Sequence, residues 1–163
     1  MKTYPLAGEQ GMTLIEVMLV LALIAMLSLW SLSGWRAYQQ RLQLEQQVQH
    51  LRIYLTQLQI TAYQYNQTRL LWIIDGPGGC VGSGVKPATC LQAGSASFQL
   101  ARQDMTITAY SEKIMGFYGR RNMAQAGHIT LSNAAGKVRL ILSARGRLRL
   151  CSEAQPMAGI ALC

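Results

Sequence analysis

The sequence has few of the side chains that catalysis and metal binding require. It contains two histidines, His50 and His128, and seven acidic residues among 163. Beyond Glu45 the acids are widely separated, at positions 75, 104, 112 and 153, and no Ser–His, paired-carboxylate or metal-ligand spacing can be assembled from them. We therefore expect that the protein is not an enzyme, that it binds no cofactor, and that it has neither catalytic nor metal-binding residues.

Charged residues are absent from Val17 to Trp35, where most positions are aliphatic or Met. A helix of this length spans roughly 28 Å, close to the ~30 Å hydrocarbon core of a bilayer. Trp35 lies at the far end, where interfacial indoles are favoured, and Arg36 marks the return to water. Glu16 stands at the near edge, and a carboxylate there needs a partner or a function. The run predicts a transmembrane helix.

Cysteine is absent from the first 79 residues, and all four cysteines follow the apolar run: Cys80, Cys90, Cys151 and Cys163. Three disulfide pairings are open, and we favour Cys80–Cys90 with Cys151–Cys163 because each closes a short loop. Metal binding is the alternative, but there is no Cys-x-x-Cys spacing and no neighbouring histidine. Disulfides persist in oxidising compartments, so we expect a periplasmic or extracellular domain and a cytoplasmic N-terminus.

Glycine and proline are absent between Trp35 and Asp75. Within 36–66, apolar residues recur at spacings of three and four, which is typical of an amphipathic helix: Leu44, Val48, Leu51, Tyr54 or Leu55, Leu58 and Ala62. A continuous helix from Met12 to about Asn66 would be roughly 80 Å long. The stripe is either a coiled-coil seam or a face that packs on the chain's own sheet, and we favour the second.

After Arg69 the pattern changes to short apolar runs separated by turn residues. The predicted strands are 70–74, 97–100, 105–110, 113–117, 128–131, 137–143 and 147–151. The glycine-rich stretch 76–84 fits no phosphate-binding motif, and we interpret it as a loop tied by Cys80–Cys90. Together the elements predict an α+β protein: a long N-terminal helix, with its first half in the membrane, packed on a small antiparallel β-sheet or sandwich with two disulfides.

Basic residues outnumber acidic ones by fifteen to seven, and none of the acids lies between Lys113 and Arg149. In a strand at 147–151, Arg147 and Arg149 would project from the wet face ~6.8 Å apart. Arg139 and Arg145 are expected nearby. Paired guanidinium groups suit phosphates. Surface ion pairs, a subunit interface and simple solubility are the alternatives.

The segment Gly11-Met12-Thr13-Leu14-Ile15-Glu16, with the apolar run after it, resembles the class III leader of type IV prepilins and type II secretion pseudopilins. The resemblance implies that prepilin peptidase cuts after Gly11 and methylates Met12, and that Glu16 pairs with the α-amino group of a neighbouring subunit. The chain departs from the family at Glu9-Gln10, where a basic residue is usual, and at Met12, where Phe is commoner.

Two plainer interpretations compete with this resemblance. One is an ordinary secretory signal peptide that uses Lys2 and is cleaved near Ser31-Leu32-Ser33. The other is a plain signal anchor in which Glu16 has no role. The count of basic residues beside the span, Lys2 before it against Arg36 and Arg41 after it, weakly favours the opposite topology. We give the cysteines more weight than this count.

The C-terminal half resembles the GspH/FimT minor pilins, including the prepilin peptidase-dependent protein A branch. The matching segments are Gly146-Arg147-Leu148-Arg149, 117–122 and 126–129. The resemblance implies that in the GspH and protein A branches this fold serves in the tip complex that starts filament assembly, and that in the FimT branch the Gly-Arg-x-Arg segment is associated with DNA binding. The second role would make Arg147 and Arg149 phosphate contacts, with weaker contributions from Arg120, Arg121 and Arg145, and Tyr118 would stack on a base.

The expected organisation is therefore a cleaved leader (1–11), a transmembrane and filament-core helix (12–35), an amphipathic periplasmic helix (36–66) and a β domain (67–163). The expected function is a minor pilin or pseudopilin that primes or caps a filament at the bacterial inner membrane. A pilus-tip DNA receptor for natural transformation is the alternative. The expected partners are other pilins, prepilin peptidase and membrane lipid, with DNA in the alternative. A membrane-anchored binding module unrelated to filaments is a third class.

Overall fold

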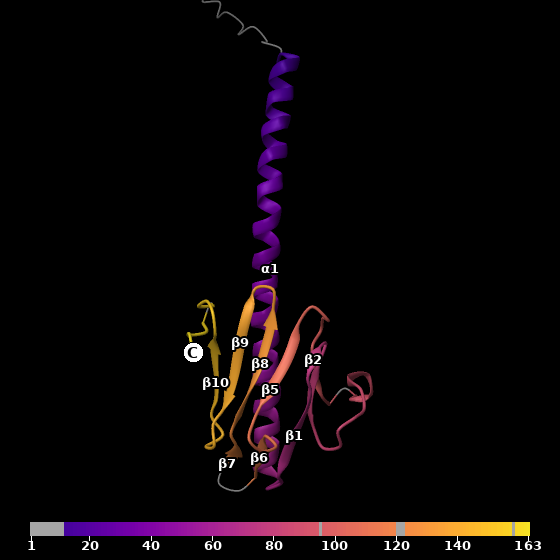
Figure 1. Cartoon of the computed structure of the whole chain (residues 1–163), viewed down its shortest axis with the longest axis vertical. Coiled ribbons are helices and arrows are strands. Elements are labelled where there is room, and N and C mark those ends of the chain that lie inside the picture. The colour runs from indigo at the N-terminus through magenta and orange to yellow at the C-terminus, as the bar shows by residue number, and fades with distance from the viewer. Residues whose placement is uncertain (1–11, 95, 120–122, 158) are drawn as a thin grey trace, which may run out of the picture. The chain divides into compact units, whose positions relative to one another are not determined.

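A computed structural model describes residues 12–94, 96–119, 123–157 and 159–163, and for residues 29–33 it describes the backbone alone. The chain divides into two compact units, Met1–Arg36 and Ala37–Cys163. Helix α1 (Leu14–Gln64) contributes residues to both units (Figure 1). The remaining regular structure is β-strand with one short 3₁₀ turn, η1 (Cys90–Gln92), so the fold is α+β with a long N-terminal helix.

The described part of the first unit is helical, and its large apolar side chains are exposed. Between Leu14 and Leu27 their exposed fractions run from 41% at Val17 to 76% at Ile15. Among the residues that the structure describes, no helix contains a stretch long and apolar enough to cross a bilayer. The transmembrane segment predicted for 12–35 includes 29–33, whose side chains lie outside the description, and it stays a prediction.

The second half of α1 buries one stripe of apolar side chains. Leu44, Val48, Leu51 and Leu55 are fully buried, and Ala62 is nearly so, which confirms the stripe predicted from the spacing. The helix ends where Asn66 adopts a positive φ of 50° and the amide of Gln67 donates to the carbonyl of Ala62 at 3.0 Å. Asn tolerates this left-handed conformation better than most residues, so it suits a helix C-terminus.

Among the described residues, the strands form two five-stranded antiparallel sheets, ordered β4-β3-β1-β6-β7 and β10-β9-β8-β5-β2. Their bounds are β1 (Arg69–Ile74), β2 (Gly76–Pro77), β3 (Cys80–Ser83), β4 (Phe98–Gln99), β5 (Thr106–Tyr110), β6 (Gly116–Tyr118), β7 (Met123–Gln125), β8 (Gly127–Asn133), β9 (Gly136–Leu142) and β10 (Leu148–Ser152).

Both sheets and the second half of α1 share one hydrophobic core. Phe117 comes from the first sheet, Ile129 and Leu140 come from the second, and Leu51 comes from the helix. Figure 1 shows β5, β8, β9 and β10 running alongside this part of α1. The amphipathic stripe therefore packs on the sheets of its own chain, as favoured from the sequence.

Four short strands differ from the sequence prediction. The stretch 76–84, predicted to be a loop, contains β2 and β3, and β7 was not predicted. The corner between β2 and β3 requires glycine at position 79, because a Cβ on Gly79 would lie only 2.2 Å from Cγ2 of Ile107. The strand predicted at 113–117 is shifted to Gly116–Tyr118. β2 pairs with the distant β5, whereas β3 and β7 pair with the neighbouring strands β1 and β6. All three are too short to show a repeating pattern in the sequence.

Two disulfides join Cys80 to Cys90 and Cys151 to Cys163, the pairs expected from the short loops. The first ties β3 to η1. The second fastens the C-terminal tail to β10, where the amide of Ser152 donates to the carbonyl of Ala161 at 2.8 Å. The tail thus covers one end of the otherwise open edge of β10.

Candidate functional site

The first turn of α1 contains Glu16, the acid for which the sequence predicts an assembly role. The carbonyl of Thr13 accepts hydrogen bonds from the amides of Glu16 (3.0 Å) and Val17 (3.2 Å), so the helix begins directly after Thr13. Thr13-x-x-Glu16 matches the capping-box pattern, and an acid in the first turn is favourable at the positive end of the helix dipole. Glu16 therefore has a local reason to be present, separate from any contact with another subunit.

The described residues next to Glu16 in the first unit are exposed and form no hydrophobic core around it. Met12 is 66% exposed, and Ile15 and Met18 on either side of Glu16 are also exposed. Gly11, on the other side of the predicted cleavage point, lies outside the described residues.

A tight hairpin presents the C-terminal arginines. The amide of Ser143 donates to the carbonyl of Arg147 at 3.0 Å, which leaves a three-residue loop between β9 and β10. Gly146 in this loop has φ of 72°, the left-handed position that such loops reserve for glycine. Its carbonyl accepts a 3.0 Å hydrogen bond from Nε2 of Gln59 on α1. The glycine of Gly-Arg-x-Arg thus closes the turn and fastens it to the helix.

The arginines of this hairpin face solvent. Arg145, Arg147 and Arg149 are exposed, while Leu148 and Leu150 are half-buried against the core, which agrees with the predicted alternation. The three arginines line a surface hollow of about 470 Å³ together with Ile141, Ser143 and Ala144. The ion pairs within the described part of the chain are Arg102–Asp104 and Arg139–Glu153, so no described carboxylate neutralises the hairpin arginines.

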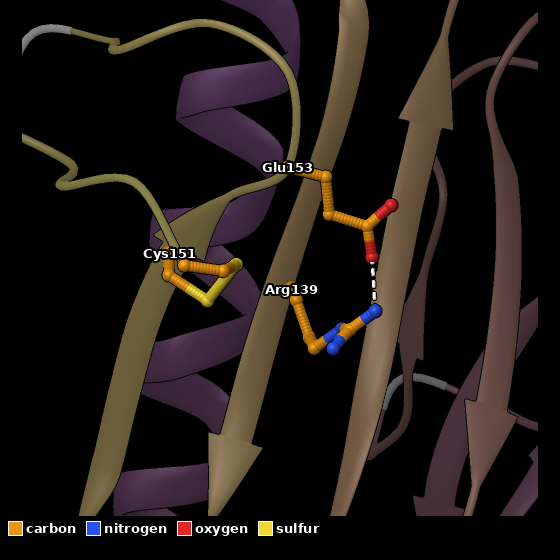
Figure 2. A network of polar contacts seen from close by, with 4 residues as sticks. Arg139, Cys151 and Glu153 are labelled. Carbon is orange, nitrogen blue, oxygen red and sulfur yellow. Dashed lines mark hydrogen bonds and ion pairs between the residues drawn. A yellow bond between two sulfur atoms is a disulfide. The ribbon is translucent and has the colours of Figure 1, made fainter.

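Arg139 has a different environment from the hairpin arginines, although it was expected near them. It lies opposite Cys151 in the β9–β10 ladder and forms an ion pair with Glu153. Figure 2 shows the two charged groups pointing toward each other beside the disulfide. Because its charge is compensated, Arg139 adds little attraction for an external anion.

The comparisons with known proteins concern the N-terminal end. Residues 6–32 match the model of the prokaryotic N-terminal methylation motif. The chain carries the N-terminal signal of a type IV pilin-like protein. No curated protein and no solved structure matched the chain. The matched range contains Gly11, Met12 and Glu16 and ends before the β domain, so the GspH/FimT assignment stays a prediction.

The remaining predicted DNA contacts are Arg120, Arg121 and Tyr118. Arg120 and Arg121 lie outside the described residues. Tyr118 pairs with Met123 between β6 and β7, its side chain is 38% exposed, and it does not line the arginine hollow. Its predicted stacking role therefore gains no support from proximity to Arg147 and Arg149.

An aromatic pair that the sequence analysis did not connect to the arginines lies on the same sheet. Tyr110 of β5 and His128 of β8 are opposite each other, and their rings stack with centroids 5.4 Å apart. Partial burial, and then the charge of Arg139, hold the pKa of His128 below its usual value of 6.5, while Glu153 acts in the opposite direction. His128 is therefore mainly neutral at pH 7. The sequence alone did not indicate this aromatic pair, because Tyr110 and His128 are 18 residues apart and meet only through the pairing of β5 with β8.

We predict that Gly146→Ala lowers the free energy of unfolding by about 1–2 kcal/mol, because an L side chain is strained in the left-handed conformation. Chemical denaturation of the full chain in mild detergent, followed by near-UV circular dichroism, measures the change. Arg145→Ala in the same turn is the control and should shift stability little, because its side chain is exposed. Equal losses in both variants would show that the turn has no special need for glycine.

Proposed function

We propose that the chain is a minor pilin or pseudopilin that is cut between Gly11 and Met12 and methylated on Met12. The observation that carries this proposal is the match of residues 6–32 to the N-terminal methylation motif. The α+β fold with a long N-terminal helix supports it. In this role the protein is a substrate of prepilin peptidase and acts by assembling with other minor and major pilins.

The exposed apolar surface of the first unit supports a role in an assembly. A soluble monomer rarely leaves many large apolar side chains in water, yet the large apolar side chains between Leu14 and Leu27 are exposed in the part of the chain that the structure describes. In the proposed function, lipid of the bacterial inner membrane covers them before assembly, and the helices of neighbouring subunits cover them in the filament. The disulfide-linked β domain would then lie in the periplasm, where such bonds persist.

Glu16 would align each subunit with its neighbour in the filament. A carboxylate in an apolar assembly is costly unless a cation compensates it, and the methylated α-amino group of a neighbouring Met12 supplies one. Filaments of a type IV pilus and of a type II secretion system both meet this description. Within either machine, the β domain would dock on other minor subunits to prime or cap the filament at its tip.

We predict that the mature protein begins at methylated Met12. Mass spectrometry of the N-terminal peptide, purified from cells that have an active prepilin peptidase, measures this directly. Co-expression with an inactive peptidase is the control and should return the uncut chain. An intact Met1 in the presence of active peptidase would exclude the pilin class and favour a membrane-anchored binding module.

We predict that Glu16→Gln and Glu16→Ala both reduce incorporation into filaments by about tenfold or more, the usual scale for losing a charge-assisted hydrogen bond. Cleavage after Gly11 should stay largely intact in both variants. Gln keeps the capping-box side chain but removes the charge, so the pair separates the two roles of Glu16. Normal incorporation of the Gln variant together with failure of the Ala variant would assign Glu16 to helix capping alone. Quantitative blotting of sheared filaments provides the measurement.

A second candidate function is DNA binding at the filament tip during DNA uptake. One observation favours it: Arg145, Arg147 and Arg149 line one hollow without a described carboxylate partner. Guanidinium groups placed together without counter-charges are well suited to phosphates, to which they bind in a bidentate manner. An acidic surface of a neighbouring subunit would satisfy the same arginines, and this alternative is part of the assembly role.

We predict that the double variant Arg147→Ala/Arg149→Ala reduces the slope of log K against log salt for duplex DNA by about two, because each phosphate contact contributes roughly 0.9. The full chain in detergent is titrated at several salt concentrations. Arg52→Ala/Lys86→Ala is the matched control, since it removes two exposed charges from other elements. If both double variants change the slope equally, binding depends on net charge and the hairpin has no specific role.

A further inference from the structure

The outer face of the second sheet arranges four residues in one line. The strand registers place Tyr110 opposite His128, His128 opposite Ile141, and Ile141 opposite Arg149. Side chains of directly opposed residues point to the same face of a sheet. Neighbouring strands are ~4.8 Å apart, so the line is roughly 14 Å long from β5 to β10. The adjacent line, which includes Ile129 and Leu140, is buried in the core, so this one faces outward.

Two hollows on this face are adjacent and share part of their lining. The first, of about 540 Å³, is lined by residues that include Tyr110, His128 and Glu112. The second is the arginine hollow of about 470 Å³. Ile141, Ser143 and Ala144 line both hollows. An elongated ligand can therefore contact the aromatic pair and the arginines at the same time.

The two ends of this surface offer complementary chemistry. At one end Tyr110 is 66% exposed, with one side of its ring stacked on His128. At the other end three guanidinium groups have no described carboxylate partner and can bind anions. The apolar side chain of Ile141 lies between the two ends. The flat ring at one end and the arginines without described carboxylate partners at the other match a ligand that has flat bases on a phosphate backbone.

We propose that this face is a platform for single-stranded polynucleotide, in which Tyr110 stacks on a base and Arg145, Arg147 and Arg149 hold phosphates. The inference rests on the DNA-binding candidate function and specifies its substrate class. A single strand is required because the bases of a duplex are stacked and paired with each other, which leaves no base face for Tyr110. An acidic protein surface would use the arginines but would have no need for the exposed ring.

Glu112 opposes the proposed ligand electrostatically, since its carboxylate lines the aromatic hollow. Like charges repel, so Glu112→Gln should strengthen binding of a polyanion across this face. The same substitution should have little effect if the strand passes over the arginines alone.

The test compares binding of a labelled 20-nucleotide oligothymidine and a duplex of the same length to the full chain in detergent, by fluorescence anisotropy at one salt concentration. We expect the single strand to bind more tightly. Tyr110→Ala should weaken its binding about tenfold, within the range measured for loss of one stacked base, and leave duplex binding unchanged. Tyr110→Phe should keep the affinity. Tyr63→Ala, which removes another exposed tyrosine (62%) from α1, is the matched control.

A second measurement uses the chain without substitutions, so it does not depend on whether a variant folds. Bromodeoxyuridine placed in the oligonucleotide should cross-link to Tyr110 on irradiation, and peptide mass spectrometry identifies the site. Cross-links confined to other residues would overturn the inference.

The outcomes separate this inference from the function on which it rests. Binding that depends on Arg147 and Arg149 but not on Tyr110, with equal affinity for single strand and duplex, overturns the platform and leaves DNA binding standing. Absence of binding to either oligonucleotide overturns both, and the arginines then belong to a contact with an acidic partner subunit.

Discussion

The packing of one apolar stripe of α1 against two small sheets is the contact on which the rest of the β domain depends. The first sheet is small, because three of its strands, β4, β6 and β7, are only two or three residues long. The helix supplies the fully buried side chains Leu44, Val48, Leu51 and Leu55. It also holds the β9–β10 turn through Gln59 and Gly146. The helix therefore contributes one contact to the turn from which the arginines project.

The two units bear surfaces of opposite chemistry. Between Leu14 and Leu27 the side chains are apolar and exposed, and they need an apolar partner. The outer face of the second sheet is polar, with free charge concentrated at the β9–β10 hairpin and compensated charge at Arg139–Glu153. In the proposed function, lipid or neighbouring helices would cover the first unit, and the second sheet would contact other molecules.

Sequence reasoning was reliable wherever the signal was local. The stripe on α1 follows from 3.6-residue periodicity, the helix end follows from Asn66, and the disulfides follow from short loops. It failed at β2, β3 and β7, because strands of two to four residues are too short to show a repeating pattern. The stacking role predicted for Tyr118, next to Arg120 in the sequence, stays a prediction because Arg120 lies outside the described residues.

The sequence by itself determined the N-terminal signal, the helical stripe and the alternation that turns Arg147 and Arg149 outward, since each depends on residues adjacent along the chain. Only the tertiary structure decided that Tyr110 and His128 share a line with Arg149 and that Glu153 compensates Arg139. The physical reason is strand register. A shift of one residue in any pairing would turn these side chains to the opposite face, and no local pattern fixes pairings between distant strands.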